Sequence, residues 1–150
     1  MNLNSVPKWV WWALGGTTAA GVLGYVGITY KNGSISGLTL LKKIDGVPVA
    51  LWSAAKFEAM RAAAAADGIT LRLNSGFRSY AEQVALYAKS FLPGEPVAAK
   101  PGYSNHQNGK AFDIDVKLGR TYQWLGDNAA RFGFRRTVKS EAWHWEYIGA

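Results

Sequence analysis

The fold of this chain is decided by two stretches, Ser104-Asn105-His106-Gln107-Asn108-Gly109-Lys110-Ala111-Phe112-Asp113 and Glu141-Ala142-Trp143-His144. They contain the only two histidines among the 150 residues. Asp113 follows His106 with Gly109 between them, so the backbone can turn and bring the two side chains together. Two imidazoles and one carboxylate suit a catalytic zinc site, in which a fourth position is left for water. Taken singly, however, each histidine is better explained as a hydrogen-bonded structural residue.

The surrounding sequence predicts a mixture of short strands and helices. Alternating apolar residues predict strands over 70–74, 112–116 and 143–148. Asp45-Gly46 predicts a hairpin within 40–49, whose second strand Pro48 would confine to a sheet edge. Apolar periodicity predicts helices over 53–66, 80–91 and 121–132, and Ser79 with Glu82 forms a capping-box pattern at the start of the second helix.

Four motifs in this order resemble the D-alanyl-D-alanine carboxypeptidase family of zinc peptidases. The two stretches quoted above match S-x-H-x-x-G-x-A-x-D and E-x-W-H, and Ser75-Gly76-Phe77-Arg78-Ser79 with Gln83 is similar to an upstream family segment. The fourth runs from Trp124-Leu125 to Phe132-Gly133-Phe134. The wider group includes phage L-alanyl-D-glutamate endopeptidases. The resemblance covers about residues 40 to 149.

The resemblance implies a zinc site with a defined set of residues. His106, Asp113 and His144 would bind Zn²⁺, and Glu141 would be the catalytic base. Arg78 would stabilise an oxyanion or hold a substrate carboxylate, and a surface salt bridge is the alternative for this residue.

Further residues have weaker assignments. Ser104 and Gln83 are candidates for substrate binding. The alternatives are that Ser104 is a turn residue and that Gln83 lies on an exposed helix face. Asp115 is left out of the ligand set, because a solvated carboxylate explains it equally well. Ala142 stands where many relatives carry Pro, and Trp145-Glu146 stands where they often carry an aromatic residue and Arg. These departures leave the bond that is cut undetermined.

Composition narrows the choice of partners. The formal net charge of +7 favours an anionic partner, but no Arg- and Lys-rich recognition helix or phosphate-binding glycine loop is visible, so nucleic acid is not expected. The chain contains no cysteine, so any metal must be held by histidine and carboxylate.

Residues 9–30 carry no charge and form a candidate transmembrane helix with aromatic residues at both ends. A cleaved secretion signal, a buried core helix and a glycine-rich packing segment are the alternatives. A Gly- and Ser-rich linker over 31–37 then separates this segment from the rest. We therefore expect an N-terminal anchor and linker over 1–37 and a peptidase domain over 38–150.

Together these features predict an α+β fold, in which a small antiparallel sheet carries the zinc site, helices flank it as in the hedgehog and DD-peptidase folds, and an apolar N-terminal helix precedes it. The expected function is hydrolysis of peptidoglycan stem peptides, as a D,D-carboxypeptidase or an L-alanyl-D-glutamate endopeptidase, in a membrane-anchored enzyme that faces the cell wall. A phage lytic enzyme would combine these properties. A non-catalytic wall-binding or virion component is the alternative, and the oligomeric state is undetermined.

Overall fold

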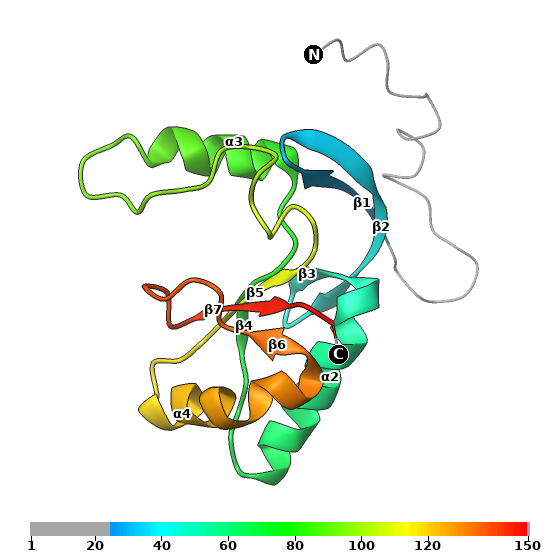
Figure 1. Ribbon diagram of the computed structural model, residues 1–150, viewed down its shortest axis with the longest axis vertical. Coiled ribbons are helices and arrows are strands. Elements are labelled where there is room, and N and C mark those ends of the chain that lie inside the picture. Colours follow the sequence, from blue (N-terminus) through cyan, green and yellow to red (C-terminus); the bar gives the residue numbers. More distant parts are fainter. Residues whose placement is uncertain (1–24, 150) are drawn as a thin grey trace.

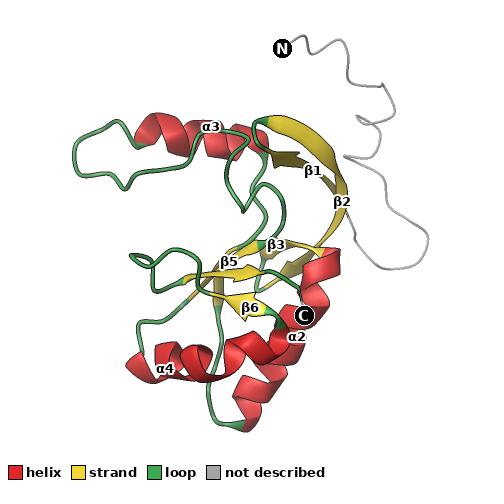
Figure 2. Cartoon of the chain, in the orientation of Figure 1, coloured by secondary structure: helices red, strands yellow, loops and turns green. Residues whose placement is uncertain are grey.

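The computed structural model describes residues 25–149, which form two antiparallel sheets and their flanking helices (Figures 1 and 2). The strands are β1 Tyr25–Lys31, β2 Ser34–Ile44, β3 Val47–Ala50, β4 Leu73–Ser75, β5 Ala111–Ile114, β6 Phe134–Arg135 and β7 His144–Tyr147. The helices are α2 Leu51–Ala66, α3 Tyr80–Lys89 and α4 Gly119–Asn128, which continues as the 3₁₀ helix η2 Ala129–Phe132. The predicted α+β class is confirmed for this part of the chain.

The first sheet has the strand order β1-β2-β3 and is built from two tight hairpins. Asn32-Gly33 joins β1 to β2, and Asp45-Gly46 joins β2 to β3. All four turn residues have positive φ angles, as two-residue hairpin turns require. The hairpin predicted at Asp45-Gly46 is confirmed, and β3, which contains Pro48, is an edge strand.

The predicted transmembrane helix over 9–30 is wrong over its last six residues. Residues 25–30 belong to β1 and not to a helix, because the segment is rich in β-branched and aromatic residues and pairs with β2. The expected linker over 31–37 instead forms the first hairpin turn and the start of β2. None of the helices in the described range 25–149 is long and apolar enough to cross a membrane. The rest of the predicted span, residues 9–24, lies outside the described residues.

The second sheet has the order β4-β5-β7-β6 and separates the apolar core from the face that carries the two histidines. Phe112 and Ile114 of β5 are fully buried in the core, where the ring of Phe112 stacks on Phe57 of α2 with centroids 5.2 Å apart. Asp113 lies between them in sequence and therefore points to the opposite face. In Figure 1, α2 and α4 lie below this sheet, while α3 and the β1–β2 hairpin lie above it. The side chain of Asp113 thus points away from the core.

The remaining elements lie close to their predicted positions. The capping box of α3 is present, with the Ser79 amide donating to Glu82 at 2.8 Å and the Glu82 amide donating to Ser79 Oγ at 3.3 Å. The predicted third helix divides into α4 and η2 and ends at Gly133, whose φ of 80° is accessible to glycine. The strand expected over 70–74 is shorter and shifted, because only residues 73–75 pair with β5.

Candidate metal centre and active site

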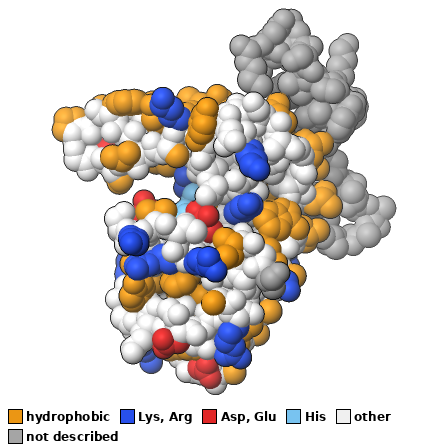
Figure 3. Space-filling model, viewed as in Figure 1, with side chains coloured by type: hydrophobic (Ala, Val, Ile, Leu, Met, Phe, Trp, Pro, Cys, Tyr) orange, Lys and Arg blue, Asp and Glu red, His pale blue; other side chains and the backbone are white. Residues whose placement is uncertain are grey.

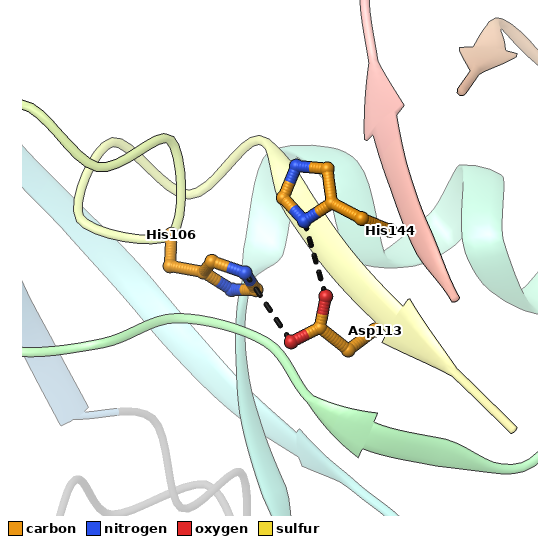
Figure 4. Close-up of side chains that lie close together, drawn as sticks. All are labelled: His106, Asp113 and His144. Carbon is orange, nitrogen blue, oxygen red and sulfur yellow. Dashed lines mark hydrogen bonds and ion pairs between the residues drawn. The ribbon is translucent and has the colours of Figure 1, made fainter. Parts of the chain in front are cut away.

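Three side chains from separate segments converge at the face of the second sheet (Figure 4). Asp113 of β5 and His144 of β7 are directly paired across the two strands, so both project from the same face. His106 reaches them from the loop that precedes β5. His106 Nε2 lies 3.4 Å from Asp113 Oδ2, and His144 Nδ1 lies 3.1 Å from Asp113 Oδ1. The predicted convergence of these three residues is confirmed.

The loop that carries His106 is fixed by a hydrogen bond to the distant Gly76 and by a turn at Gly109. His106 Nδ1 lies 2.7 Å from the carbonyl oxygen of Gly76. Because a carbonyl only accepts, Nδ1 carries the hydrogen, and Nε2 of the neutral ring presents its lone pair to Asp113. Gly109 has a φ of 77°, and a Cβ at this position would lie 2.6 Å from Cβ of Ala50. The turn expected at Gly109 is therefore present and requires glycine.

The donor set fits a zinc ion. A lone pair of His106 faces an ionised carboxylate, an arrangement that becomes favourable when a cation lies between the two groups. Ligands bound to zinc at about 2.0–2.1 Å in tetrahedral geometry lie about 3.3 Å apart. The 3.4 Å and 3.1 Å separations in this cluster are close to that value, and all three ligand atoms lie within 4.8 Å of one another. Two nitrogens and one carboxylate oxygen leave a fourth position for water or substrate.

The electrostatics of the cluster also favour a positive charge. Burial raises the pKa of Asp113, but the contacts of its carboxylate with the two imidazoles, His106 and His144, outweigh burial and hold this pKa well below its ordinary value. Burial lowers the pKa of His144, but hydrogen bonds with Asp113 and Glu146 outweigh it and raise the pKa to about 9. A cation at this position, whether a proton or a metal ion, is therefore stabilised.

Glu141 lies at the solvent side of the cluster. It precedes β7, and the turn is closed by the His144 amide, which donates to the Glu141 carbonyl at 3.3 Å. Its Oε2 lies 3.7 Å from His144 Nδ1, and the side chain is 36% exposed. Glu141 therefore lies beside the ligand atoms and has access to water.

Arg78 and Gln83 form a connected pair near the cluster. Arg78 Nη1 donates to Gln83 Oε1 at 2.9 Å, and Arg78 Nη2 donates to Ser75 Oγ at 3.3 Å. Gln83 is 1% exposed and its Nε2 donates to the carbonyl of Ala99 at 2.7 Å, so it is not on an exposed helix face. Burial lowers the pKa of Arg78. The negative charges of Asp113, Glu82 and Glu141 act in the opposite direction, but burial is the larger effect. Arg78 is thus a half-buried cation facing the carboxylates of the site.

Two other candidates have local roles. Ser104 is buried, and its Oγ accepts from the His106 amide at 3.3 Å, so it shapes the loop that presents His106. Asp115 lies beyond the end of β5, and its Oδ1 accepts from the Lys117 amide at 3.0 Å. Leaving Asp115 out of the ligand set is consistent with this geometry.

Sequence reasoning missed Glu146, which contacts the cluster, and Asn105, which contacts Glu146. Glu146 Oε1 lies 2.9 Å from His144 Nε2, and Asn105 Nδ2 donates to the same oxygen at 2.8 Å. The signal was the strand period of two, which places Glu146 on the same face of β7 as His144. In the sequence, Glu146 stands out only as a departure from the family pattern.

The cluster lies in a hollow that Figure 3 shows between the α3 region and the body of the second sheet, with histidine surface at its inner end. A cavity of about 490 Å³ lies elsewhere. It is lined by the β1–β2 hairpin, Trp52 and the loop around Asn105. A smaller cavity of about 290 Å³ is lined in part by Arg78. We assign the chemistry to the open hollow, because the ligand atoms and Glu141 lie there.

Residues 50–150 match the family described as VanY, D-alanyl-D-alanine carboxypeptidase. A D-alanyl-D-alanine carboxypeptidase of Enterococcus faecalis is 34% identical over an alignment that covers 58% of this chain. That alignment covers 43% of the relative, so the chain spans less than half of the relative's length.

Two solved structures are similar in fold to this chain. A mutant of the vancomycin-resistance D,D-pentapeptidase VanY, solved in complex with Zn(II), is 25% identical with a TM-score of 0.62. The alignment covers 81% of this chain and 87% of that one. The LD-carboxypeptidase LdcB is 28% identical with a TM-score of 0.60, covering 83% of this chain and 68% of that one.

Proposed function

Since the chain belongs to the VanY family of D-alanyl-D-alanine carboxypeptidases, we propose that it is a zinc-dependent peptidase that hydrolyses stem peptides of bacterial peptidoglycan. The observation that carries this proposal is the cluster of His106, Asp113 and His144 with Glu141 beside it. A protein that only binds the wall would not need a base next to a metal site. The non-catalytic alternative is therefore the weaker one.

The proposed mechanism assigns proton transfer to Glu141. Zinc bound by the three ligands would supply Lewis-acid polarisation of the scissile carbonyl and lower the pKa of water at the open position. Glu141 accepts the proton of the attacking water and then delivers it to the leaving amine. Its partial exposure and its position 3.7 Å from a ligand nitrogen suit this role, because the carboxylate can reach both water and substrate.

Arg78 is proposed to bind the C-terminal carboxylate of the substrate or the developing oxyanion. Its bonds to Gln83 and Ser75 use two of the five N–H donors of a guanidinium and hold its plane in position. Because the guanidinium is half-buried, its attraction for an anion is screened less than at the surface. Gln83 would then act on substrate through Arg78, and Ser104 through the His106 loop.

We propose that the chain removes a single terminal D-alanine, as a carboxypeptidase does. Arg78 supports this reading, because a cation near the metal site can recognise a free carboxylate. The relatives include both D,D- and LD-carboxypeptidases, so the position of the bond is what the experiment must determine.

The experiment uses purified zinc-loaded protein and wall fragments that end in pentapeptides or tetrapeptides, followed by mass spectrometry. Loss of one alanine from pentapeptides indicates D,D-carboxypeptidase activity, and loss from tetrapeptides indicates LD-carboxypeptidase activity. Separation of the stem from the glycan would instead identify an endopeptidase, as expected for a phage lytic enzyme. A zinc-loaded protein that binds these fragments and yields no product would favour the wall-binding alternative.

We further propose that the domain acts on the outer side of the cytoplasmic membrane, because its substrate lies there. The predicted anchor now rests on residues 9–24 alone, since 25–30 form β1. Fractionation of the full chain and of a shortened chain starting at Tyr25 tests this: only the full chain should remain with the membranes. Equal amounts of both proteins in the soluble fraction would contradict the prediction of a membrane anchor.

A further inference from the structure

The two histidines of the cluster present different ring nitrogens to Asp113. His106 uses Nε2, because its Nδ1 donates to the carbonyl of Gly76 at 2.7 Å. His144 uses Nδ1, and its Nε2 lies 2.9 Å from Glu146 Oε1. If a metal ion took the Nδ1 lone pair, the one hydrogen of the neutral ring would lie on Nε2, where the Glu146 carboxylate, which only accepts, can receive it. Each ring is therefore oriented by an acceptor on the side away from Asp113.

The two acceptors differ in charge and in origin. Gly76 supplies a neutral backbone oxygen, which no substitution of a side chain removes. Glu146 supplies a charged side chain that is only 7% exposed. Its Oε1 lies 2.9 Å from His144 Nε2 and accepts from Asn105 Nδ2 at 2.8 Å, so the buried side chain is held against the ring.

Glu146 is itself held in place from the opposite side of the site. Asn105 Nδ2 donates to Glu146 Oε1 at 2.8 Å, and Asn105 immediately precedes His106 in the chain. The backbone carbonyl of Asn105 also accepts from the amides of Lys110 and Ala111 at 3.1 and 3.2 Å. The chain Asn105–Glu146–His144 thus joins the loop of one ligand to the strand of the other.

We propose that Glu146 is a positioning residue for the metal centre, which fixes His144 as an Nδ1 ligand and strengthens metal binding. A carboxylate on the outer nitrogen of a ligating imidazole raises the basicity of the ring and holds its orientation. Loss of such a partner typically weakens metal binding by about 10- to 100-fold. The proposal rests on the assignment of His144 as a metal ligand under the proposed function, and it adds a residue that acts through His144.

The test measures the zinc dissociation constant by competition with a chelator for the wild type, Glu146→Gln and Glu146→Leu. Gln keeps an acceptor without the charge, whereas Leu removes both. We expect weakening by about 10-fold for Gln and closer to 100-fold for Leu. Glu58→Gln is the matched control, because Glu58 pairs with Lys42 at the surface of α2, and its zinc affinity should equal that of the wild type.

A second measurement excludes a purely structural role. In ¹⁵N spectra of the zinc-loaded wild type, the imidazole of His144 should show a metal-bound Nδ1 and an Nε2–H that exchanges slowly with water. Glu146→Leu should lose this slow exchange, whereas Glu58→Gln should keep it. If Glu146→Leu does not fold, Glu146→Gln and Asn105→Ala carry the test, and Asn105→Ala should weaken zinc binding while leaving both acidic groups in place.

The outcomes separate this inference from the proposed function. Zinc affinity within about threefold of the wild type in folded Glu146 variants would overturn it, as would coordination of His144 through Nε2. Either result leaves the proposed function standing if the wild type binds zinc and cleaves stem peptides. A wild type that binds no zinc would instead defeat the proposed function, and the inference with it.

Discussion

The two sheets differ in how far apart along the chain their partners lie. In the first sheet, β1, β2 and β3 follow one another through two-residue turns, so every pairing is local. In the second sheet, β5 pairs with β4 and β7, and each partner lies at least thirty residues away. The metal ligands all belong to the second sheet or to the loop that enters it. The first sheet, which pairs strands that are neighbours in the chain, contributes no metal ligand. The second sheet pairs strands that are far apart in the chain, and this pairing brings the ligands together.

The largest expected effect in the second sheet comes from removing a ligand. His144→Ala takes away one of the three ligand atoms and the partner of both Asp113 and Glu146. We expect zinc content to fall from about one ion per chain to near zero, with complete loss of hydrolysis, because two remaining ligands hold zinc weakly. Elemental analysis and an activity assay measure both. A variant with full zinc content would show that the ligand set is wrong.

Glu141→Gln should leave the same sheet and its ligands intact while removing the base. Size and most hydrogen bonding are kept, so we expect little change in zinc content or thermal stability. The rate should fall by about 10²- to 10⁴-fold, mainly in kcat, because proton transfer occurs in the transition state. Steady-state kinetics with zinc analysis measure this. Loss of zinc would make Glu141 a ligand, and near-normal turnover would place the base elsewhere.

The first sheet can be tested through a glycine of β1 that lies against Phe77, in the segment between β4 and α3. A Cβ on Gly27 of β1 would lie 2.6 Å from the Phe77 ring, so Gly27→Ala should lower the free energy of unfolding by about 1–3 kcal/mol. Gly126 of α4 is the matched control, because a Cβ there meets no atom within 4 Å. Gly126→Ala should raise stability by about 0.5–1 kcal/mol, because alanine favours the helix. Chemical denaturation that gave both variants the same sign would contradict the packing of β1.

The smallest effect concerns the second hairpin turn. Burial raises the pKa of Asp45, but the Leu73 amide and the Arg61 guanidinium outweigh it and lower this pKa. The stabilisation is therefore present above the ordinary pKa of Asp and is lost as the pH falls through the lowered value. Asp45→Asn keeps a residue that tolerates positive φ and should cost about 0.5–1 kcal/mol near neutral pH, since the pair with Arg61 is partly exposed. Denaturation at neutral and acid pH should show this difference disappearing in acid.

Local signals were sufficient for several elements. The capping box of Ser79 and Glu82, the Asp45-Gly46 turn and the alanine-rich stretch of α2 all depend on residues that are close in sequence. Asn32-Gly33 carries the same kind of signal, because this dipeptide favours a hairpin turn, although the composition of 31–37 predicts a linker there. The uncharged run before it predicts one helix through Tyr30, but residues 25–30 form β1. Short apolar segments do not distinguish helix from strand by pattern alone, and pairing with β2 decided the outcome.

With two histidines and no cysteine, the sequence restricts any metal site to histidine and carboxylate ligands, and the resemblance to D-alanyl-D-alanine carboxypeptidases implies that these are His106, Asp113 and His144. The sequence does not indicate which nitrogen of each ring faces Asp113 or which acceptor holds the other nitrogen, and these contacts are known only from the folded chain. The physical reason is that Gly76 and His106, like Asn105 and Glu146, meet only after strands distant in the chain have paired.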